Sequence, residues 1–181
     1  MTAALLIIDI QNDYFPGGAM ELVGSEAAGK VAAKVKAHFR DQDLPIINIQ
    51  HIAIREGATF FLPGTPGAEI HESVAIGEGE SHIAKHYPNS FRETNLADTL
   101  SGLGVNDLTV VGMMTHMCVD TTVRAASDAG FKVTLISDAC ATRNLTFGHT
   151  VAAADVQAAY LAALDGSFAN VVNSKQYLEQ A

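Results

Sequence analysis

The sequence is short of basic residues, of cysteine and of long apolar runs. Its 181 residues include 11 lysines and arginines against 20 aspartates and glutamates, which gives a formal net charge of -9. A surface that binds nucleic acid needs clustered positive charge to neutralise phosphates. We therefore expect no nucleic-acid partner and predict a small-molecule ligand instead.

No apolar run approaches the roughly 18 consecutive residues that a membrane-spanning helix requires. The N-terminus carries no basic segment, and its short apolar run ends at Asp9, so the sequence predicts no signal peptide. We therefore expect a cytoplasmic protein without a membrane partner. In that compartment Cys118 and Cys140 are expected to stay free thiols.

Motifs for cofactors and metals are also missing. No Gly-x-Gly-x-x-Gly follows a predicted strand, and no Gly-x-x-x-x-Gly-Lys-Ser/Thr occurs. The seven histidines are scattered, and none follows an aspartate in an Asp-x-His motif. His82 and His86 are four residues apart, but they lie at a predicted strand and not on a helix, where that spacing supplies two metal ligands from one face. The sequence therefore predicts no cofactor and no metal ion.

What the sequence does contain is a regular alternation of short β-branched runs and Ala-rich stretches with helical spacing. The predicted buried strands are residues 4–8, 45–49, 108–111, 132–136 and 169–172, with a weaker candidate at 82–84. The predicted helices are residues 26–39, 96–103, 119–129 and 151–164. This alternation predicts βαβ units around a mainly parallel sheet, in one domain covering residues 1–181.

Cys118 lies where an apolar run of strand character gives way to a helix-like segment. A thiol near a helix N-terminus meets unpaired N–H groups and the positive end of the helix dipole, and both favour the thiolate. The alternative is that Cys118 is a small apolar core residue, but its position beside Thr115 and His116 favours a reactive thiol. Cys140 has only Asp138 nearby, and we predict a structural role for it.

Two charged residues are predicted to lie near this thiol. Asp9 ends the first strand, at the edge where open α/β sheets bind ligands, and would act there as a base; alternatively, it only caps a turn. Lys85 follows the weakest strand and would hold a neighbouring carboxylate in its charged form; alternatively, it is one more solvated lysine. Residues 54–80 form the longest stretch without periodic pattern, and loops of that length are usually functional or disordered.

Three segments resemble the isochorismatase-like cysteine hydrolases, the superfamily that includes nicotinamidases and other small-amide hydrolases. They are Asp9-Ile-Gln-Asn-Asp13, the run Lys-His-Tyr-Pro-Asn-Ser-Phe at residues 85–91, and the run Gly-Met-Met-Thr-His-Met-Cys-Val-Asp-Thr-Thr-Val-Arg at residues 112–124. The resemblance covers essentially the whole chain. It implies a three-layer Rossmann-like α/β fold, in which helices flank a six-stranded parallel sheet and the strands before Asp9 and Cys118 lie side by side.

The same resemblance implies a role for each site residue. Cys118 would be the nucleophile, Asp9 the general base and Lys85 the third catalytic member. The backbone N–H groups of Met114 and Cys118 would form the oxyanion hole, with a cis peptide bond between Met113 and Met114. Such an enzyme cleaves the C–N bond of a small amide, carbamoyl or ureido compound through a thioester.

The resemblance also bears on the substrate pocket and on metal binding. Tyr14 and the Phe60–Phe61 pair are candidate substrate-binding residues, although the two phenylalanines could instead pack the loop onto the core. In metal-binding nicotinamidases an Asp-x-His motif follows the second strand. Here His51 and Ala53 occupy its two positions, so the comparison implies that a metal site is missing.

Other functions remain open at this stage. They are isochorismatase-type or nicotinamidase activity, a thiol redox or sensor role for Cys118 with Cys140 as its partner, and a non-catalytic binding role. Members of the superfamily commonly self-associate, so the resemblance also implies a homodimer or homotetramer.

Overall fold

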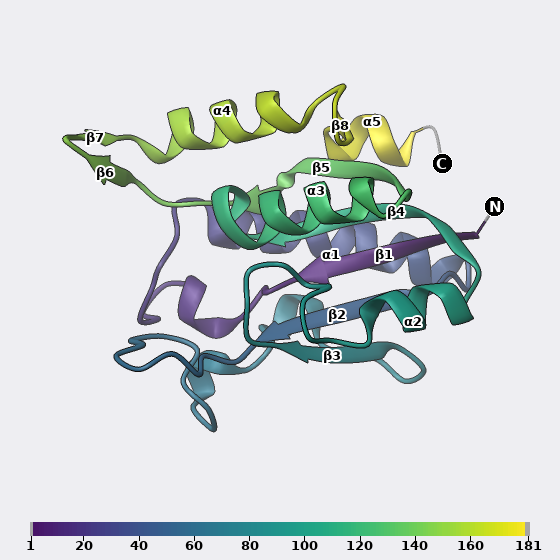
Figure 1. The fold of residues 1–181 in the computed structure, drawn as a ribbon, viewed down its shortest axis with the longest axis horizontal. Helices are drawn as coiled ribbons and strands as arrows, with labels where there is room; N and C mark the ends of the chain where they lie inside the picture. The colour runs from purple at the N-terminus through teal and green to yellow at the C-terminus, as the bar shows by residue number, and fades with distance from the viewer. Residues whose placement is uncertain (1, 180–181) are drawn as a thin grey trace.

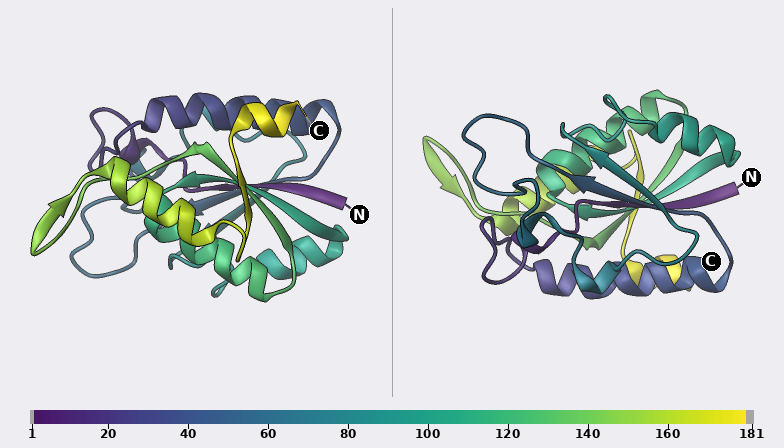
Figure 2. Two further views of the ribbon diagram at one scale, coloured as in Figure 1. Left: turned by 90° about the horizontal axis from the view of Figure 1, so that it is seen from above. Right: turned by 90° about the horizontal axis from the view of Figure 1, so that it is seen from below.

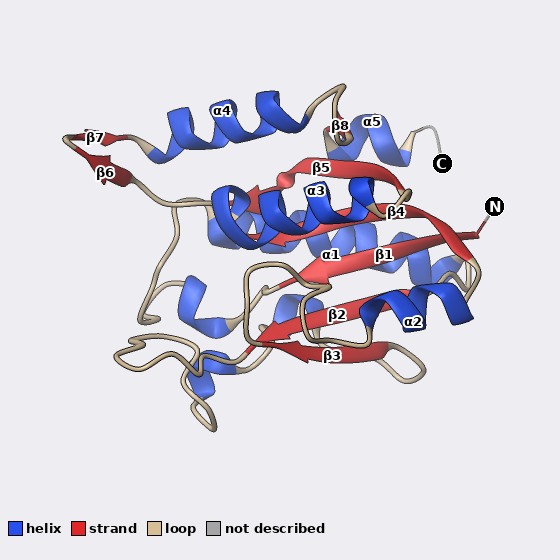
Figure 3. Ribbon diagram, viewed as in Figure 1, coloured by secondary structure: helices blue, strands red, loops and turns tan. Residues whose placement is uncertain are grey.

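The fold of residues 2–179 is described by a computed structural model, and residues 1, 180 and 181 of the predicted domain lie outside the described residues. A six-stranded sheet in the order β3-β2-β1-β4-β5-β8 forms its centre, and every neighbouring pair of strands is parallel. The strands are β1 (Thr2–Ile8), β2 (Ile46–His51), β3 (Ser81–Lys85), β4 (Val105–Met113), β5 (Lys132–Ala141) and β8 (Asn170–Val172). Helices flank this sheet, as predicted (Figures 1 and 3).

Helices cover both faces of the sheet (Figure 2). One face carries α1 (Ser25–Asp41) and α5 (Ser174–Leu178); the other carries α2 (Leu96–Gly102), α3 (Asp120–Asp128) and α4 (Ala153–Leu164). Side chains of β1 alternate between the two cores: Leu6 and Ile8 pack toward α2, α3 and α4, while Leu5 and Ile7 pack toward α1. Because both faces are buried, the strands are apolar runs without polar alternation.

The strand order reverses between β1 and β4. The chain runs from β1 outward to β2 and β3, and then returns to pair β4 with the other side of β1. Gly112 makes the close approach of these two strands possible, because its φ is 147° and a Cβ atom there would collide with the carbonyl oxygen of Ile8. Open α/β sheets bind ligands at the carboxyl ends of the strands beside such a reversal.

The structure differs from the sequence-based expectation in several elements. Strand β5 continues five residues beyond its predicted end at residue 136, to Ala141. Two short strands, β6 (Leu145–Phe147) and β7 (His149–Val151), form a separate hairpin, so the helix predicted from residue 151 begins at Ala153. The loop 54–80 contains two 3₁₀ turns, Pro66–Ala68 and Glu72–Val74. None of the helices within residues 2–179 has the length and apolar character needed to cross a membrane.

Candidate active site

Asp9 and Lys85 form a buried ion pair at the carboxyl edge of the sheet. Asp9 follows β1 with a φ of 50°, Lys85 ends β3, and both side chains are fully buried. Lys85 Nζ donates to Asp9 Oδ2 at 2.7 Å and to the carbonyl oxygen of Tyr87 at 3.1 Å. Asp9 Oδ1 has no hydrogen-bond partner within residues 2–179. Oδ2 of this carboxylate therefore accepts a hydrogen bond from Lys85, while Oδ1 can accept one from a further donor.

Cys118 lies beside this ion pair. It belongs to a π-helical turn, Thr115–Val119, between β4 and α3, and only 4% of its surface is exposed. Its sulfur, a carboxylate oxygen of Asp9 and a ring nitrogen of His51 all lie within 4.8 Å of one another. The fold thus brings together three side chains that are far apart in the sequence. The peptide bond between Met113 and Met114, just before the turn, is cis.

The electrostatics of the thiol differ from the sequence-based expectation. Burial raises the pKa of Cys118 well above its usual value, and the negative charge of Asp9 raises it further, while Lys85 opposes both. This direction is opposite to the predicted one, because burial and the neighbouring carboxylate favour the neutral thiol. Burial alone would lower the pKa of Lys85, but Asp9 and Cys118 raise it, so its ammonium stays charged.

His51 is a neutral neighbour that the sequence did not assign to the site. It ends β2, between the strands of Asp9 and Lys85, and burial lowers its pKa to about 4. Its Nδ1 lies 3.2 Å from Lys85 Nζ and accepts a hydrogen bond from that ammonium group. The proton of the neutral imidazole is therefore on Nε2. The signal that could have found it is a polar residue closing a buried strand at the ligand edge.

The same geometry bears on metal binding. Asp9, His51 and Cys118 are the group within residues 2–179 whose side chains could hold a metal ion. The Lys85 ammonium already lies within hydrogen-bond distance of both Asp9 and His51. A metal ion would have to displace this ammonium from both residues, so this donor set does not fit a metal ion.

A cavity of about 700 Å³ leads to Cys118, and the predicted substrate-binding residues Tyr14, Phe60 and Phe61 all line it. The Tyr14 and Phe61 rings pack with centroids 4.6 Å apart. Asp13 fixes this wall, because its Oδ2 accepts a 2.6 Å hydrogen bond from the Phe61 N–H. The remaining lining residues are Met20, His51, Ala53, Ile54, Arg55, Ala58, His86, Tyr87, Pro88, Met114, Met117, Cys118 and Arg143.

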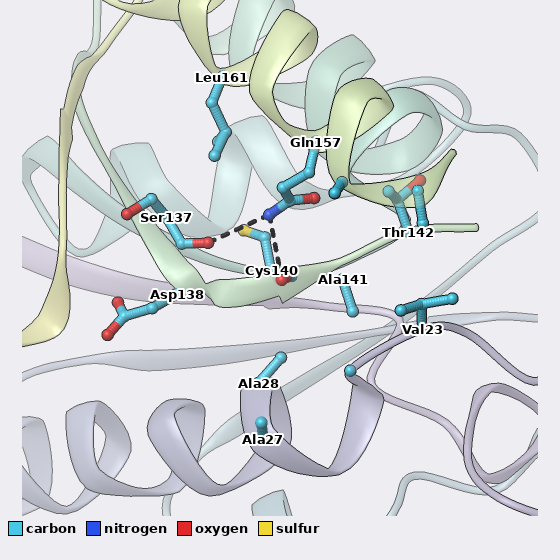
Figure 4. A pocket seen from close by; sticks show the side chains of 13 residues that line it. Val23, Ala27, Ala28, Ser137, Asp138, Cys140, Ala141, Thr142, Gln157 and Leu161 are labelled. Atoms are coloured by element: carbon cyan, nitrogen blue, oxygen red, sulfur yellow. Dashed lines mark hydrogen bonds between the residues drawn. The ribbon is translucent and has the colours of Figure 1, made fainter. Parts of the chain in front are cut away.

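Cys140 lies in a different cavity, between α1, β5 and α4 (Figure 4). It is buried, and its thiol donates to the carbonyl oxygen of Ile136 at 3.4 Å. In Figure 4 Gln157 reaches from α4 to β5, where its amide donates to Ser137 and Cys140 carbonyl oxygens, both at 3.2 Å. Gln157 Oε1 also accepts a 2.6 Å bond from Thr115. This amide therefore ties the π-helical turn of Cys118 to α4 and β5.

Comparison with known proteins agrees with this geometry. The family model described as the isochorismatase domain matches residues 3–176. The chain belongs to the isochorismatase family. Isochorismatase family protein YddQ of Bacillus subtilis is 47% identical over 99% of this chain and 100% of its own length. A solved isochorismatase-family structure from Oleispira antarctica has a TM-score of 0.95 and 47% identity, covering 98% of this chain and 96% of its own.

More distant isochorismatase relatives carry names that state a role. The secreted isochorismatase effector Isc1 of Verticillium dahliae is 33% identical over 96% of this chain and 88% of its own length. Maleamate amidohydrolase of Pseudomonas putida is 26% identical over 98% of this chain and 85% of its own length. Streptothricin hydrolase and nicotinamidase are also among the relatives. This chain is accordingly an isochorismatase-family hydrolase.

Proposed function

We propose that this isochorismatase-family hydrolase cleaves the C–N bond of a small amide, carbamoyl or ureido compound through a thioester on Cys118. The observation that carries the proposal is the buried Asp9–Lys85 pair beside the Cys118 sulfur, next to a cavity of about 700 Å³. A carboxylate with one unpartnered oxygen is a base positioned for a thiol proton. The amidohydrolase relative supports the same reaction class.

In the first half-reaction the thiol loses its proton as it attacks. Asp9 Oδ1 accepts the proton of Cys118, while Lys85 holds Oδ2 and balances the charge. The sulfur adds to the substrate carbonyl carbon, and the resulting oxyanion accepts hydrogen bonds from the Met114 and Cys118 N–H groups. When the C–N bond breaks, Asp9 returns the proton to the leaving nitrogen. Ammonia or an amine departs, and the acyl group remains on sulfur as a thioester.

In the second half-reaction a water molecule takes the place of the leaving amine. Asp9 accepts one of its protons, and the hydroxide oxygen attacks the thioester carbonyl. Collapse breaks the C–S bond and releases the acid, and the Cys118 sulfur recovers its proton from Asp9. In this scheme the Lys85 ammonium is the positive charge that balances the Asp9 carboxylate, and no metal ion is required.

The test is a screen of small primary amides and ureido compounds for release of ammonia. We expect turnover of at least one compound by the wild type, and a loss of at least about 10³-fold in kcat for Cys118→Ala. Cys140→Ala is the matched control, since it removes the other buried thiol and should retain activity. An active Cys118→Ala protein would refute the covalent mechanism.

Two alternatives are outcomes of the same screen. Nicotinamide belongs in the panel, because nicotinamidase activity is one of the nearest rivals. Isochorismatase-type activity needs a second readout: a vinyl ether related to isochorismate is assayed for its carbonyl product, since its hydrolysis releases no ammonia. The redox alternative needs Cys140 as a resolving thiol, and Cys140 faces a separate cavity from Cys118. That separation favours hydrolysis over disulfide chemistry.

A further inference from the structure

The cavity at Cys118 has a charge opposite to that of the protein as a whole. The chain carries 20 acidic residues against 11 basic ones, yet the sixteen lining residues include Arg55 and Arg143 and no aspartate or glutamate. Asp9 lies beneath this lining, and its charge is balanced by Lys85 at 2.7 Å. The two lining residues of fixed charge are therefore both cationic.

These two arginines also differ from the others in their partners. The other three arginines of the chain form ion pairs, Arg40 with Glu80, Arg92 with Glu93 and Arg124 with Asp120. Within residues 2–179, neither Arg55 nor Arg143 has a salt bridge or a side-chain hydrogen bond.

The two unpaired guanidinium groups come from different parts of the chain. Arg55 lies on the loop that follows β2, and Arg143 follows β5 by two residues. The strands before both residues end at the carboxyl edge of the sheet, and both residues line the same cavity. Both are exposed, so an incoming anion can reach them.

We propose that Arg55 and Arg143 bind a carboxylate of the substrate, so that the substrate is an amide that also carries an acid group. A guanidinium presents paired N–H donors that match the two oxygens of a carboxylate. The rest of the lining is mostly apolar and aromatic, which suits a short carbon chain between the two polar ends. The amide part of this inference rests on the proposed function, whereas the anion site does not.

The anion site can be tested without any substrate, by alkylating Cys118. Iodoacetate and iodoacetamide react with the same thiolate, so the ratio of their rates is independent of the thiol pKa. We divide the rate with iodoacetate by the rate with iodoacetamide, and normalise this ratio to that of a free cysteine derivative. We expect the normalised ratio to be about 10 at low salt and to fall as salt is added. Peptide mapping separates the labelling of Cys118 from that of Cys140.

Arg143→Gln and Arg55→Gln should each lower the ratio, and the double variant should bring it to that of the free thiol. Any change in the thiol pKa cancels in the ratio, because the iodoacetamide rate of each variant is its denominator. An unfolding midpoint in urea equal to that of the wild type shows that the fold is intact. Lys132→Gln is the matched control. It removes the same charge from an exposed position at the amino end of β5, and should leave the ratio unchanged.

A turnover experiment then tests the substrate class. We compare the half-amide of a four-carbon dicarboxylic acid with its methyl ester, which keeps the amide and removes the charge. The wild type should favour the acid by about 10-fold in kcat/KM, and Arg143→Gln should reduce that preference mainly through KM.

The outcomes separate the two proposals. An alkylation ratio equal to that of the free thiol, or one that both arginine variants leave unchanged, overturns the anion site even if neutral amides are hydrolysed. Equal turnover of acid and ester overturns the carboxylate-bearing substrate. A high, arginine-dependent ratio without hydrolysis of any amide supports the anion site and counts against the amidase.

Discussion

The Cys118 thiol lies between one negative and one positive charge, and these act on its pKa in opposite directions. Burial raises the pKa most, Asp9 adds to that increase, and Lys85 opposes it. The resting enzyme therefore holds a thiol, and the proton leaves during attack. A thiol that ionises only during attack has less thiolate available for unwanted oxidation or alkylation.

Neutral substitutions at the two charged residues should shift this thiol in opposite directions. At one pH below the thiol pKa, Asp9→Asn should speed alkylation of Cys118 by iodoacetamide, since it removes a charge that raises the pKa. Lys85→Met should slow it. Both variants should lose amide hydrolysis, by about 10²-fold or more for the missing base. Rate constants measured over a pH series on a Cys140→Ala background check this, and shifts in the same direction would contradict the assigned electrostatics.

At the scale of elements, an ion-pair network fastens the loop 54–80 to α1. Lys36 on α1 is buried and donates to the carbonyl oxygens of Val74 and Ala75. It also lies 2.7 Å from Glu80, which pairs with Arg40 from the next turn of the helix. The network therefore anchors the C-terminal part of the loop, residues 74–80, to α1.

Glu80 should make stability depend on pH in the acid range. Burial alone would raise the pKa of Glu80, but hydrogen bonds from Lys36, Gly77, Asn48 and Arg40 lower it from 4.5 to about 2. A carboxyl group whose pKa is lower in the folded state stabilises the fold above pH 4.5 and loses that contribution as the pH falls to 2.

Glu80→Gln should therefore lower the free energy of unfolding by about 3 kcal/mol at neutral pH. The difference from the wild type should shrink as the pH falls from 4.5 toward 2, because Glu80 is then protonated in both states. Urea unfolding at a series of pH values measures this. Glu78→Gln, on the same loop but exposed, is the control. A pH-independent difference would show that the charge of Glu80 does not act as described.

At the scale of the whole molecule, the β6–β7 hairpin projects from the body beside α4 (Figures 1 and 2). Phe147 at its tip is 95% exposed, and an isolated two-stranded hairpin is marginally stable in water. Residues 144–164 carry Asp155 and no other aspartate, glutamate, lysine or arginine, in a chain of net charge -9. We propose that a second copy covers this surface, since it exposes an aromatic side chain and carries little charge to oppose the approach of an identical chain.

Phe147→Ser should weaken self-association without affecting the fold. Sedimentation velocity over a range of concentrations should show dimers or tetramers for the wild type and a shift toward monomer for the variant. Leu103→Ser, at an exposed apolar residue directly after α2, is the control and should behave as the wild type. A monomeric wild type, or an unchanged distribution for Phe147→Ser, would rule out this interface.

Most of the fold could be predicted from the sequence because it depends on local signals. Apolar runs such as residues 4–8 and 132–136 are strands because both faces of a parallel sheet are buried, and Ala-rich stretches between them cover those faces. The sequence did not predict the hairpin at residues 145–151 or helix α5. The two strands of the hairpin have three residues each and α5 has five, so these elements are too short to show a periodic pattern.

For the site, the sequence determined which residues were candidates: the motifs around Asp9, Lys85 and Cys118 identified them before any geometry was known. Only the tertiary structure decided how they interact. Burial next to a carboxylate reverses the expected pKa shift of the thiol. His51 and Arg143, from distant segments of the chain, line the same cavity. Desolvation and charge proximity depend on what packs around a group, and a linear pattern of residues does not contain that information.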